Sequence, residues 1–166
     1  MHRFRPEWGT HIPALLKALE ISKGSVLELG LGISSTPILH AICEHEGRLL
    51  VSCDNDKTFT DMFKKYATPT HQIRLVEDWQ EVKPEPCGIV LIDHKPEERR
   101  AKDIARFAHF AEILVVHDTE PEHEDLYHMQ EIMNSFASRL DYVKPTVHTT
   151  LLSNYYDLNK LHYPKY

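Results

Sequence analysis

Short apolar runs alternate along the chain with segments of helical periodicity. Seven runs have the length and composition of β-strands, in chain order Val26–Leu29, Leu49–Cys53, Gln72–Val76, Ile89–Ile92, Glu112–Val116, Tyr142–Lys144 and Thr149–Leu152. The fourth and fifth runs are apolar on both faces, which is typical of central parallel strands covered by helices on each side. The pattern therefore predicts a sheet with a buried centre.

The segments between the strands have the signals of helices. Thr36 and Pro37 are typical of a helix cap and a first helical residue, and they lead into a helix that includes Leu39 and Ile42. Four further helices are expected, at Thr10–Leu19, Asp56–Tyr66, Glu97–His109 and Glu124–Leu140. Five β-α units followed by a strand pair predict an α/β fold, with a doubly wound, mostly parallel seven-stranded sheet and helices on both faces.

The sequence predicts one domain over residues 1–166, with a leading helical segment at 1–23, because 166 residues is close to the commonest size of one domain. The N-terminus lacks the apolar stretch of a signal peptide, and no apolar run approaches the roughly 20 residues that span a bilayer. Three cysteines without a Cys-x-x-Cys pair indicate a reducing compartment. We therefore expect a cytoplasmic protein that does not enter a membrane.

Glycines and polar residues follow the first five predicted strands. In a doubly wound sheet, ligands bind outside the carboxyl ends of the strands, near the point where the strand order reverses. The residues at these ends are Gly30, Gly32, Asp54, Asp78, Trp79, Asp93, His94, His117 and Asp118. This edge of the sheet is the expected binding site.

Gly30 and Gly32 stand between a strand and a helix, where glycines let the backbone turn sharply and approach a ligand closely. An ordinary strand-to-helix turn would also use glycine. Asp54 favours a ligand, because it ends the next strand, 22 positions after Gly32 (54 − 32), where a carboxylate can accept both hydroxyl protons of a ribose. This spacing is compatible with a dinucleotide as well.

Two details distinguish the turn from a dinucleotide fingerprint. Ser35 stands where the pattern Gly-x-Gly-x-x-Gly requires its third glycine, and Glu28 stands two positions before Gly30. With this acid-x-Gly-x-Gly pattern, the chain resembles the class I S-adenosylmethionine-dependent methyltransferases from about residue 24 to its end. The residues that match the further motifs of that family are Asp54, Asp78, Trp79 and Asp93. The resemblance implies a sheet whose last strand pair is antiparallel.

The resemblance also implies how these residues would bind S-adenosylmethionine. Gly30 and Gly32 would pass under the methionine part, and Glu28 would help to fix the turn and the amino group of the cofactor. Asp54 would accept hydrogen bonds from the ribose hydroxyls, because a carboxylate is an acceptor only.

Asp78 and Trp79 have two interpretations each. As cofactor residues, Asp78 would accept a hydrogen bond from the adenine amino group and Trp79 would cover the ring. As ordinary structural residues, Asp78 would be a solvated turn residue and Trp79 part of the core.

The pairs Asp93-His94 and His117-Asp118 end the fourth and fifth strands and are expected to face each other. Asp93 and Asp118 could bind Mg²⁺ through oxygen ligands, and the ion would orient an acceptor hydroxyl and lower its pKa. This arrangement resembles the catechol-type O-methyltransferases, in which an Asp-His pair follows strand four and an Asp-Asn pair follows strand five. Thr119 replaces that asparagine, and Pro96 stands where that family has its catalytic lysine.

A metal-free reaction is the other interpretation of the same residues. His94 or His117 would act as general base, because a histidine titrates near neutral pH. Asp93 or Asp118 would then orient the ring, although Asp93 could equally cap the following helix. His11 could cover the cofactor or substrate from the N-terminal side, or simply pack there.

These observations favour an S-adenosylmethionine-dependent methyltransferase that methylates an oxygen of a small molecule by in-line transfer. The net charge of -6 and the lack of a basic, aromatic-rich insertion disfavour a nucleic-acid substrate. The chain has few segments beyond the predicted sheet and its helices that could recognise a substrate. The binding crevice at the carboxyl edge of the sheet is therefore open, is completed by a second copy in a homo-oligomer, or takes a small acceptor. The alternative is an S-adenosylmethionine-binding protein without methyltransferase activity: a regulatory subunit, a sensor or a cofactor-cleaving enzyme.

Overall fold

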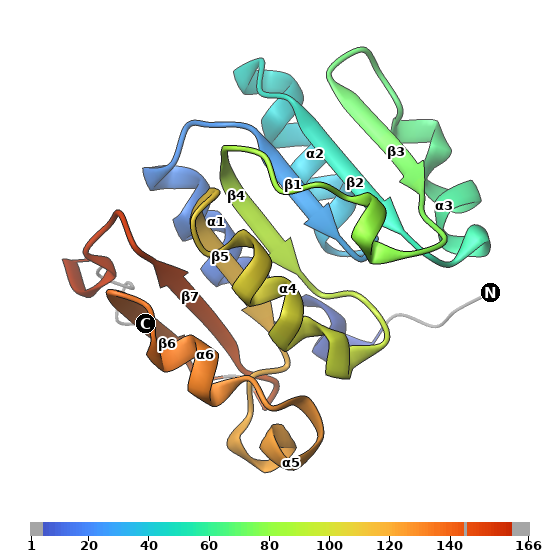
Figure 1. The fold of residues 1–166 in the computed structure, drawn as a ribbon. Coiled ribbons are helices and arrows are strands. Elements are labelled where there is room, and N and C mark those ends of the chain that lie inside the picture. Colours follow the sequence, from blue (N-terminus) through green and yellow to red (C-terminus); the bar gives the residue numbers. More distant parts are fainter. Residues whose placement is uncertain (1–4, 145, 161–166) are drawn as a thin grey trace.

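The computed structural model describes residues 5–144 and 146–160, and its centre is a seven-stranded sheet (Figure 1). The strand order is β3-β2-β1-β4-β5-β7-β6. The strands are β1 Val26–Leu29, β2 Leu50–Asp54, β3 His71–Leu75, β4 Cys87–Ile92, β5 Ala111–His117, β6 Ser138–Tyr142 and β7 Thr149–Ser153. Residues 1–4, 145 and 161–166, which the predicted single domain includes, lie outside the described residues.

The sheet confirms the predicted topology. Strands β1 to β5 are parallel, whereas β7 pairs antiparallel with both β5 and β6. The strand order reverses between β1 and β4, which are neighbours in the sheet. Their carboxyl ends therefore form the place where doubly wound sheets bind ligands.

Helices cover both faces of this sheet, as predicted. They are α1 Ile12–Ile21, α2 Ser35–Glu46, α3 Lys57–Phe63, α4 Arg100–Phe107, α5 Glu124–Tyr127 and α6 Gln130–Asn134. Helices α1 and α2 lie on one face, and α4 and α6 lie on the other (Figure 1). Two apolar cores result, one on each side of the sheet: Leu15 and Leu39 belong to the first, and Ile104 and Met133 to the second.

Two predictions about the helices are wrong. The long helix expected at Glu124–Leu140 is broken after Tyr127, because His128 has a positive φ of 50° that ends the helical path. Its last residues belong instead to β6, which begins at Ser138. The third β-α unit also lacks a helix: between β3 and β4 the chain forms only a 3₁₀ turn at Trp79–Glu81.

The missing helix leaves part of the sheet open. A groove of about 260 Å³ lies over this region, and Leu27, Val51 and Arg74 contribute to its lining.

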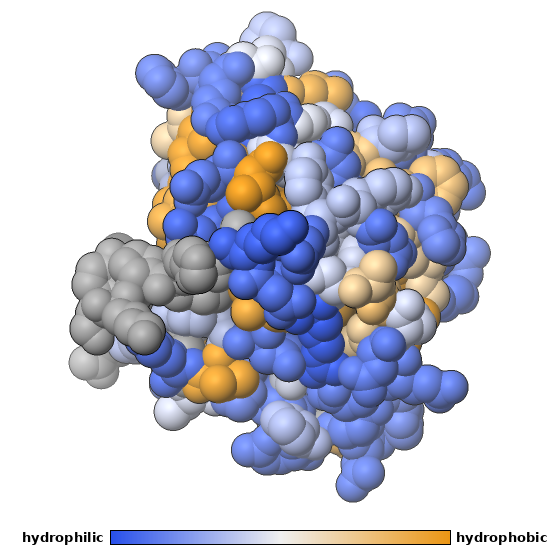
Figure 2. Space-filling model, turned by 90° about the vertical axis from the view of Figure 1, so that its left-hand side faces the viewer, coloured by the Kyte–Doolittle hydropathy of each residue, from blue (hydrophilic) through white to orange (hydrophobic). Residues whose placement is uncertain are grey.

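The side of the molecule seen in Figure 2 is mostly hydrophilic, with scattered hydrophobic groups. Within the described ranges, none of the helices has the length and apolar character needed to cross a membrane.

Candidate functional site

Alternation along β4 and β5 decides which side chains meet at the carboxyl edge. Successive side chains of a strand point to opposite faces of the sheet. Leu91 and Val115 are opposite each other in the β4–β5 pair and both pack on the side of α1 and α2. Two residues further on, Asp93 and His117 follow on that same side. His94 is the next residue after Asp93, so its side chain points to the opposite side of the sheet, where α4 lies.

The glycine turn connects β1 to α2 and lies against the end of β4. Gly30 has a φ of +98°, and a Cβ atom there would stand 2.5 Å from the backbone oxygen of Asp93. A Cβ on Gly32 would stand 2.6 Å from Oγ of Ser35. Gly30 therefore requires glycine for its conformation and for space, whereas a side chain at Gly32 would have to displace the hydroxyl of Ser35.

Glu28 lies beneath this turn and is fully buried. Its carboxylate accepts hydrogen bonds from the hydroxyl of Ser35 at 2.6 Å and from that of Thr36 at 3.0 Å. Burial raises the pKa of Glu28 to about 7, although these hydroxyls favour the ionised form. Glu28 thus fixes the start of α2, and Ser35 replaces the third glycine of a dinucleotide site with a hydrogen-bond donor.

Asp54 ends β2 beside the same turn. Its Oδ2 accepts a hydrogen bond from the backbone N–H of Leu31 at 2.8 Å, and its Oδ1 accepts one from the N–H of Asp56 at 2.7 Å. Burial raises the pKa of Asp54 above its ordinary value. A carboxylate oxygen can accept two hydrogen bonds, so each oxygen retains capacity for a ligand hydroxyl.

Asp78 and Trp79 follow β3 and differ in exposure. The exposed Asp78 begins the 3₁₀ turn by accepting a hydrogen bond from the N–H of Gln80 at 2.9 Å. Trp79 is only 3% exposed and belongs to the core beside α4, and its indole N–H donates to the carbonyl of Lys95 at 2.7 Å. Packing therefore accounts for Trp79 without a cofactor, and its predicted role at the adenine ring stays a prediction.

His94 is buried on the side of α4. Its Nε2 lies 2.8 Å from Oδ2 of Asp103, and its ring stacks on Trp79 with the ring centroids 4.4 Å apart. The structure thus places His94 away from His117 and next to the helix that follows it. The predicted role of His94 as general base has no support from this geometry.

Arg100 joins the two aspartates that were expected to bind magnesium. From α4, its guanidinium donates to Oδ2 of Asp118 at 2.6 Å and to Oδ1 of Asp93 at 3.2 Å. The side chain of Arg100 is 2% exposed, so its charge acts at close range in poorly solvated surroundings. Because this cation already links both carboxylates, the geometry does not favour Mg²⁺ between Asp93 and Asp118. Asp118 also has a positive φ of 56°.

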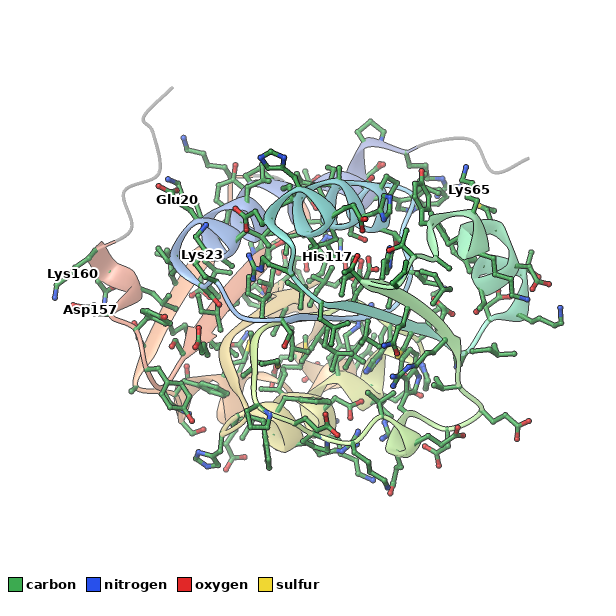
Figure 3. All side chains as sticks on the ribbon, turned by 90° about the horizontal axis from the view of Figure 1, so that it is seen from above. Glu20, Lys23, Lys65, His117, Asp157 and Lys160 are labelled. Atoms are coloured by element: carbon green, nitrogen blue, oxygen red, sulfur yellow. The ribbon has the colours of Figure 1, made fainter. Side chains whose placement is uncertain are left out.

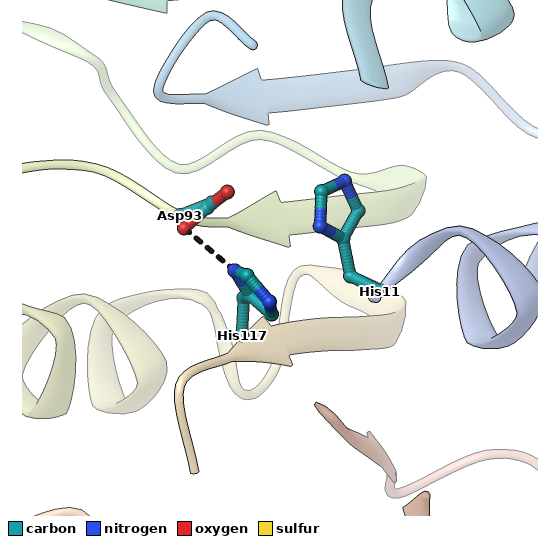
Figure 4. A group of neighbouring side chains, drawn as sticks. All are labelled: His11, Asp93 and His117. Carbon is teal, nitrogen blue, oxygen red and sulfur yellow. Dashed lines mark hydrogen bonds and ion pairs between the residues drawn. The ribbon is translucent and has the colours of Figure 1, made fainter. Parts of the chain in front are cut away.

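His117 connects Asp93 to the N-terminal segment of the chain. Its Nδ1 lies 3.1 Å from Oδ1 of Asp93, and its Nε2 lies 2.9 Å from the hydroxyl of Thr10. Burial alone would lower the pKa of His117, but the charges of Asp93 and Asp118 outweigh it and raise this pKa. Figure 3 shows His117 in the interior of the molecule, and Figure 4 shows its contact with Asp93.

His11 approaches this pair from the residue before α1. Its ring meets that of His117 edge to face, with centroids 4.6 Å apart, and it is 1% exposed. Burial lowers the pKa of His11 to about 4, so the ring is neutral at pH 7. Gly9 lies against Ser34. The N-terminal segment therefore packs directly on the glycine turn and on the end of β5.

Three residues of this site carry no signal of their own in the sequence. Arg100 stands within a run of charged residues, Thr10 in a polar segment, and Asp103 on an amphipathic helix. Each acquires its partner only when α1 or α4 packs against the sheet. His117 and Asp93, in contrast, could have been assigned to one face by counting alternate residues from Val115 and Leu91.

The sequence matches no protein-family model and no curated protein. Solved structures are similar in fold. An O-methyltransferase from Bacillus cereus in complex with SAH has a TM-score of 0.62 and 14% identity, over 92% of this chain and 83% of that chain. The ribosomal protein L11 methylase from Lactobacillus delbrueckii subsp. bulgaricus has a TM-score of 0.64 and 12% identity, over 89% and 79% of the two chains.

The N-methyltransferase NodS from Bradyrhizobium japonicum has a TM-score of 0.59 and 11% identity, over 88% of this chain and 94% of that chain. These proteins differ in acceptor by their names, yet each aligns with nearly all of this chain. The chain has the fold of the class I S-adenosylmethionine-dependent methyltransferases.

Proposed function

We propose that the protein is an S-adenosylmethionine-dependent methyltransferase. The observation that carries this proposal is the carboxylate of Asp54, held 2.8 Å from the N–H of Leu31 in the glycine turn. A ribose carried over this turn would meet the Asp54 oxygens, and the methionine part would lie over Gly30 and Gly32. The fold supports the same cofactor, as do its structural neighbours, which are methyltransferases, one of them in complex with SAH.

We further propose that the acceptor atom is an oxygen of a small molecule. The contact between Nε2 of His117 and the hydroxyl of Thr10 supports this, because it shows that a hydroxyl fits beside that ring at 2.9 Å. An acceptor hydroxyl in the place of the Thr10 side chain would lie beside His117. Methyl transfer needs chiefly alignment of the two reacting atoms, so positioning the acceptor is the main task of the chain.

The four residues predicted to be catalytic receive different roles in this proposal. Asp93 and His117 would contact the acceptor. Asp118 would act through Arg100, to which it binds at 2.6 Å, and would thereby position Asp93. His94, which binds Asp103, would support α4. Magnesium at Asp93 and Asp118 is not part of the proposal, because Arg100 links these two carboxylates.

A methyl-transfer assay tests this proposal. S-adenosylmethionine with a labelled methyl group is incubated with the protein and with pools of small hydroxyl, amine and thiol compounds. We expect label to enter hydroxyl compounds. Transfer to amines alone would contradict the oxygen acceptor while leaving the methyltransferase assignment in place.

The second candidate is a protein that binds S-adenosylmethionine without transferring its methyl group. The burial of His11 and His117, 1% and 4% exposed, favours this candidate, because Thr10 and His11 fill the place that an acceptor would need. This candidate would be supported if the protein binds the cofactor but transfers no methyl group to any compound pool. Transfer should then also be absent in a Thr10→Gly variant, which opens the place filled by the Thr10 side chain.

A further inference from the structure

We propose that His11, Asp93 and His117 form a binding site for a divalent transition metal such as Zn²⁺. The three residues come from three separate parts of the chain: the residue before α1, the end of β4 and the end of β5 (Figure 4). One ligand atom from each lies within 4.8 Å of the others. The site is distinct from the expected pair Asp93 and Asp118.

His11 is the first observation that points to a ligand. Both ring nitrogens of this side chain are buried and have no hydrogen-bond partner among the described residues. A buried polar group without a partner costs about 1–3 kcal/mol. One of these nitrogens carries a lone pair in the neutral ring, and a metal ion placed among the three residues would engage it.

The hydrogen bonds of Thr10 are the second observation. The Thr10 hydroxyl donates to the carbonyl of Glu7 at 3.0 Å, so it accepts the proton of His117 Nε2 at 2.9 Å. In a neutral ring, Nδ1 then carries a lone pair that faces Oδ1 of Asp93 at 3.1 Å. Two acceptors at this distance need a positive charge between them, which a ring proton supplies when His117 is protonated and which a metal ion would supply when the ring is neutral. Ligands about 2.1 Å from a tetrahedral zinc ion lie roughly 3.4 Å apart, close to the separation found here.

The ligand set determines which metals fit. Two imidazoles and one carboxylate favour zinc, cobalt, nickel or iron over magnesium and calcium, which prefer oxygen ligands. Metal-binding histidines usually donate their second ring N–H to another group, as His117 does to Thr10. Asp93 likewise accepts a hydrogen bond from Arg100 at 3.2 Å.

Arg100 also sets the charge of the proposed site. Arg100 and a divalent ion carry three positive charges, and Asp93 and Asp118 carry two negative ones, so one positive charge remains. This excess would favour an anionic ligand, such as hydroxide, at the open position of the metal. The metal site does not depend on the proposed function.

Metal binding is measured on the full chain after treatment with a chelator. Equilibrium dialysis gives the stoichiometry and affinity for Zn²⁺, and the visible absorption of bound Co²⁺ reports its coordination. The variants are His11→Asn and His11→Phe, which remove the ligand and differ in polarity and size. His45→Ala is the matched control, because His45 is an exposed histidine on α2.

We expect one zinc ion per chain, a tetrahedral cobalt spectrum, and affinity reduced at least about 100-fold in both His11 variants with none lost in His45→Ala. Equal affinity in wild type and in either folded His11 variant would overturn the site, as would wild-type binding no tighter than that of scattered surface histidines. Circular dichroism establishes that each variant is folded. Calorimetry with S-adenosylhomocysteine tests the proposed function separately, because the cofactor residues are not altered.

Discussion

Gly30 is the residue whose replacement has the clearest expected cost. An added Cβ would be strained by the φ of +98° and would also stand 2.5 Å from the backbone oxygen of Asp93. Gly47 has a φ of +67° but nothing within 4 Å of such an atom. Comparing alanine variants of Gly30 and Gly47 therefore separates the cost of backbone strain from the cost of steric overlap.

We predict that Gly47→Ala lowers the free energy of unfolding by about 1 kcal/mol, which is the cost of a left-handed alanine. Gly30→Ala should lower it by about 3 kcal/mol or more, because backbone atoms must also move. Urea denaturation measures both values. Equal losses of unfolding free energy in the two variants would mean that a side chain at Gly30 does not overlap with the backbone at the end of β4.

Glu28 should make the protein less stable as the pH rises. The unfolded chain loses this proton near pH 4.5, whereas the folded protein keeps it until about pH 7. Stability present below pH 4.5 is therefore lost between these values, and the loss is roughly 3 kcal/mol at 1.36 kcal/mol per pH unit. Glu28→Gln removes the titration, so its unfolding free energy should change less between pH 5 and pH 8.

The matched control for Glu28 is Glu20→Gln, because Glu20 lies on the surface of α1 with its side chain 65% exposed. The difference between each variant and the wild type is compared at the two pH values by urea denaturation. Parallel pH dependence in Glu28→Gln and wild type would contradict a protonated Glu28 in the folded protein.

Single residues were predictable from sequence where their chemistry follows from strand position. The places of Gly30, Asp54, Asp93 and His117 at one edge of the sheet follow from counting along the strands. The partners of these residues do not, because Arg100 reaches Asp93 and Asp118 only when α4 packs on the sheet. His94 shows the same limit, since its contact with Asp103 depends on that helix.

At the scale of elements, the break between α5 and α6 is the clearest departure from the sequence pattern. Apolar residues recur at helical spacing from Glu124 onward, yet the backbone turns at His128. The carboxylate of Glu124 then accepts hydrogen bonds from the N–H groups of Met129 and Gln130 at 3.0 and 2.9 Å. These bonds fix where α6 begins.

We predict that Glu124→Ala lowers the free energy of unfolding by about 1–2 kcal/mol, because two N–H groups at the start of α6 lose their acceptor. This corresponds to a fall in Tm of roughly 2–8 °C for a domain of this size. The control is Glu131→Ala, which replaces an exposed residue of α6 and should leave Tm almost unchanged. An unaltered Tm in Glu124→Ala would show that α6 begins there without this cap.

Strands proved more predictable than helices because their signal is local. Six strands were anticipated to within two residues, since each is a short apolar run, whereas the sixth was predicted at Tyr142–Lys144 and lies at Ser138–Tyr142, where polar residues alternate with Leu140. The helix Glu124–Leu140 failed because periodicity alone cannot detect the turn at His128, and the absent helix between β3 and β4 left only a short 3₁₀ turn at Trp79–Glu81.

At the scale of the molecule, the reversal of strand order between β1 and β4 brings the two halves of the site together. The half at β1 and β2 holds the glycine turn and Asp54, and the half at β4 and β5 holds Asp93 and His117. The N-terminal segment covers both, through Gly9 against Ser34 and through His11 beside His117. Cofactor and acceptor would thus meet under this segment.

Calorimetry with S-adenosylhomocysteine and with NAD, on wild type, Asp54→Asn and Asp56→Asn, tests the central claim most directly. Asp56 is the matched control, because its side chain caps α3 through the N–H of Thr58. We predict that S-adenosylhomocysteine binds wild type and Asp56→Asn alike, that Asp54→Asn binds it about 10- to 100-fold more weakly, and that NAD gives no heat. Binding of NAD with no response to S-adenosylhomocysteine, or unchanged affinity in Asp54→Asn, would contradict the account.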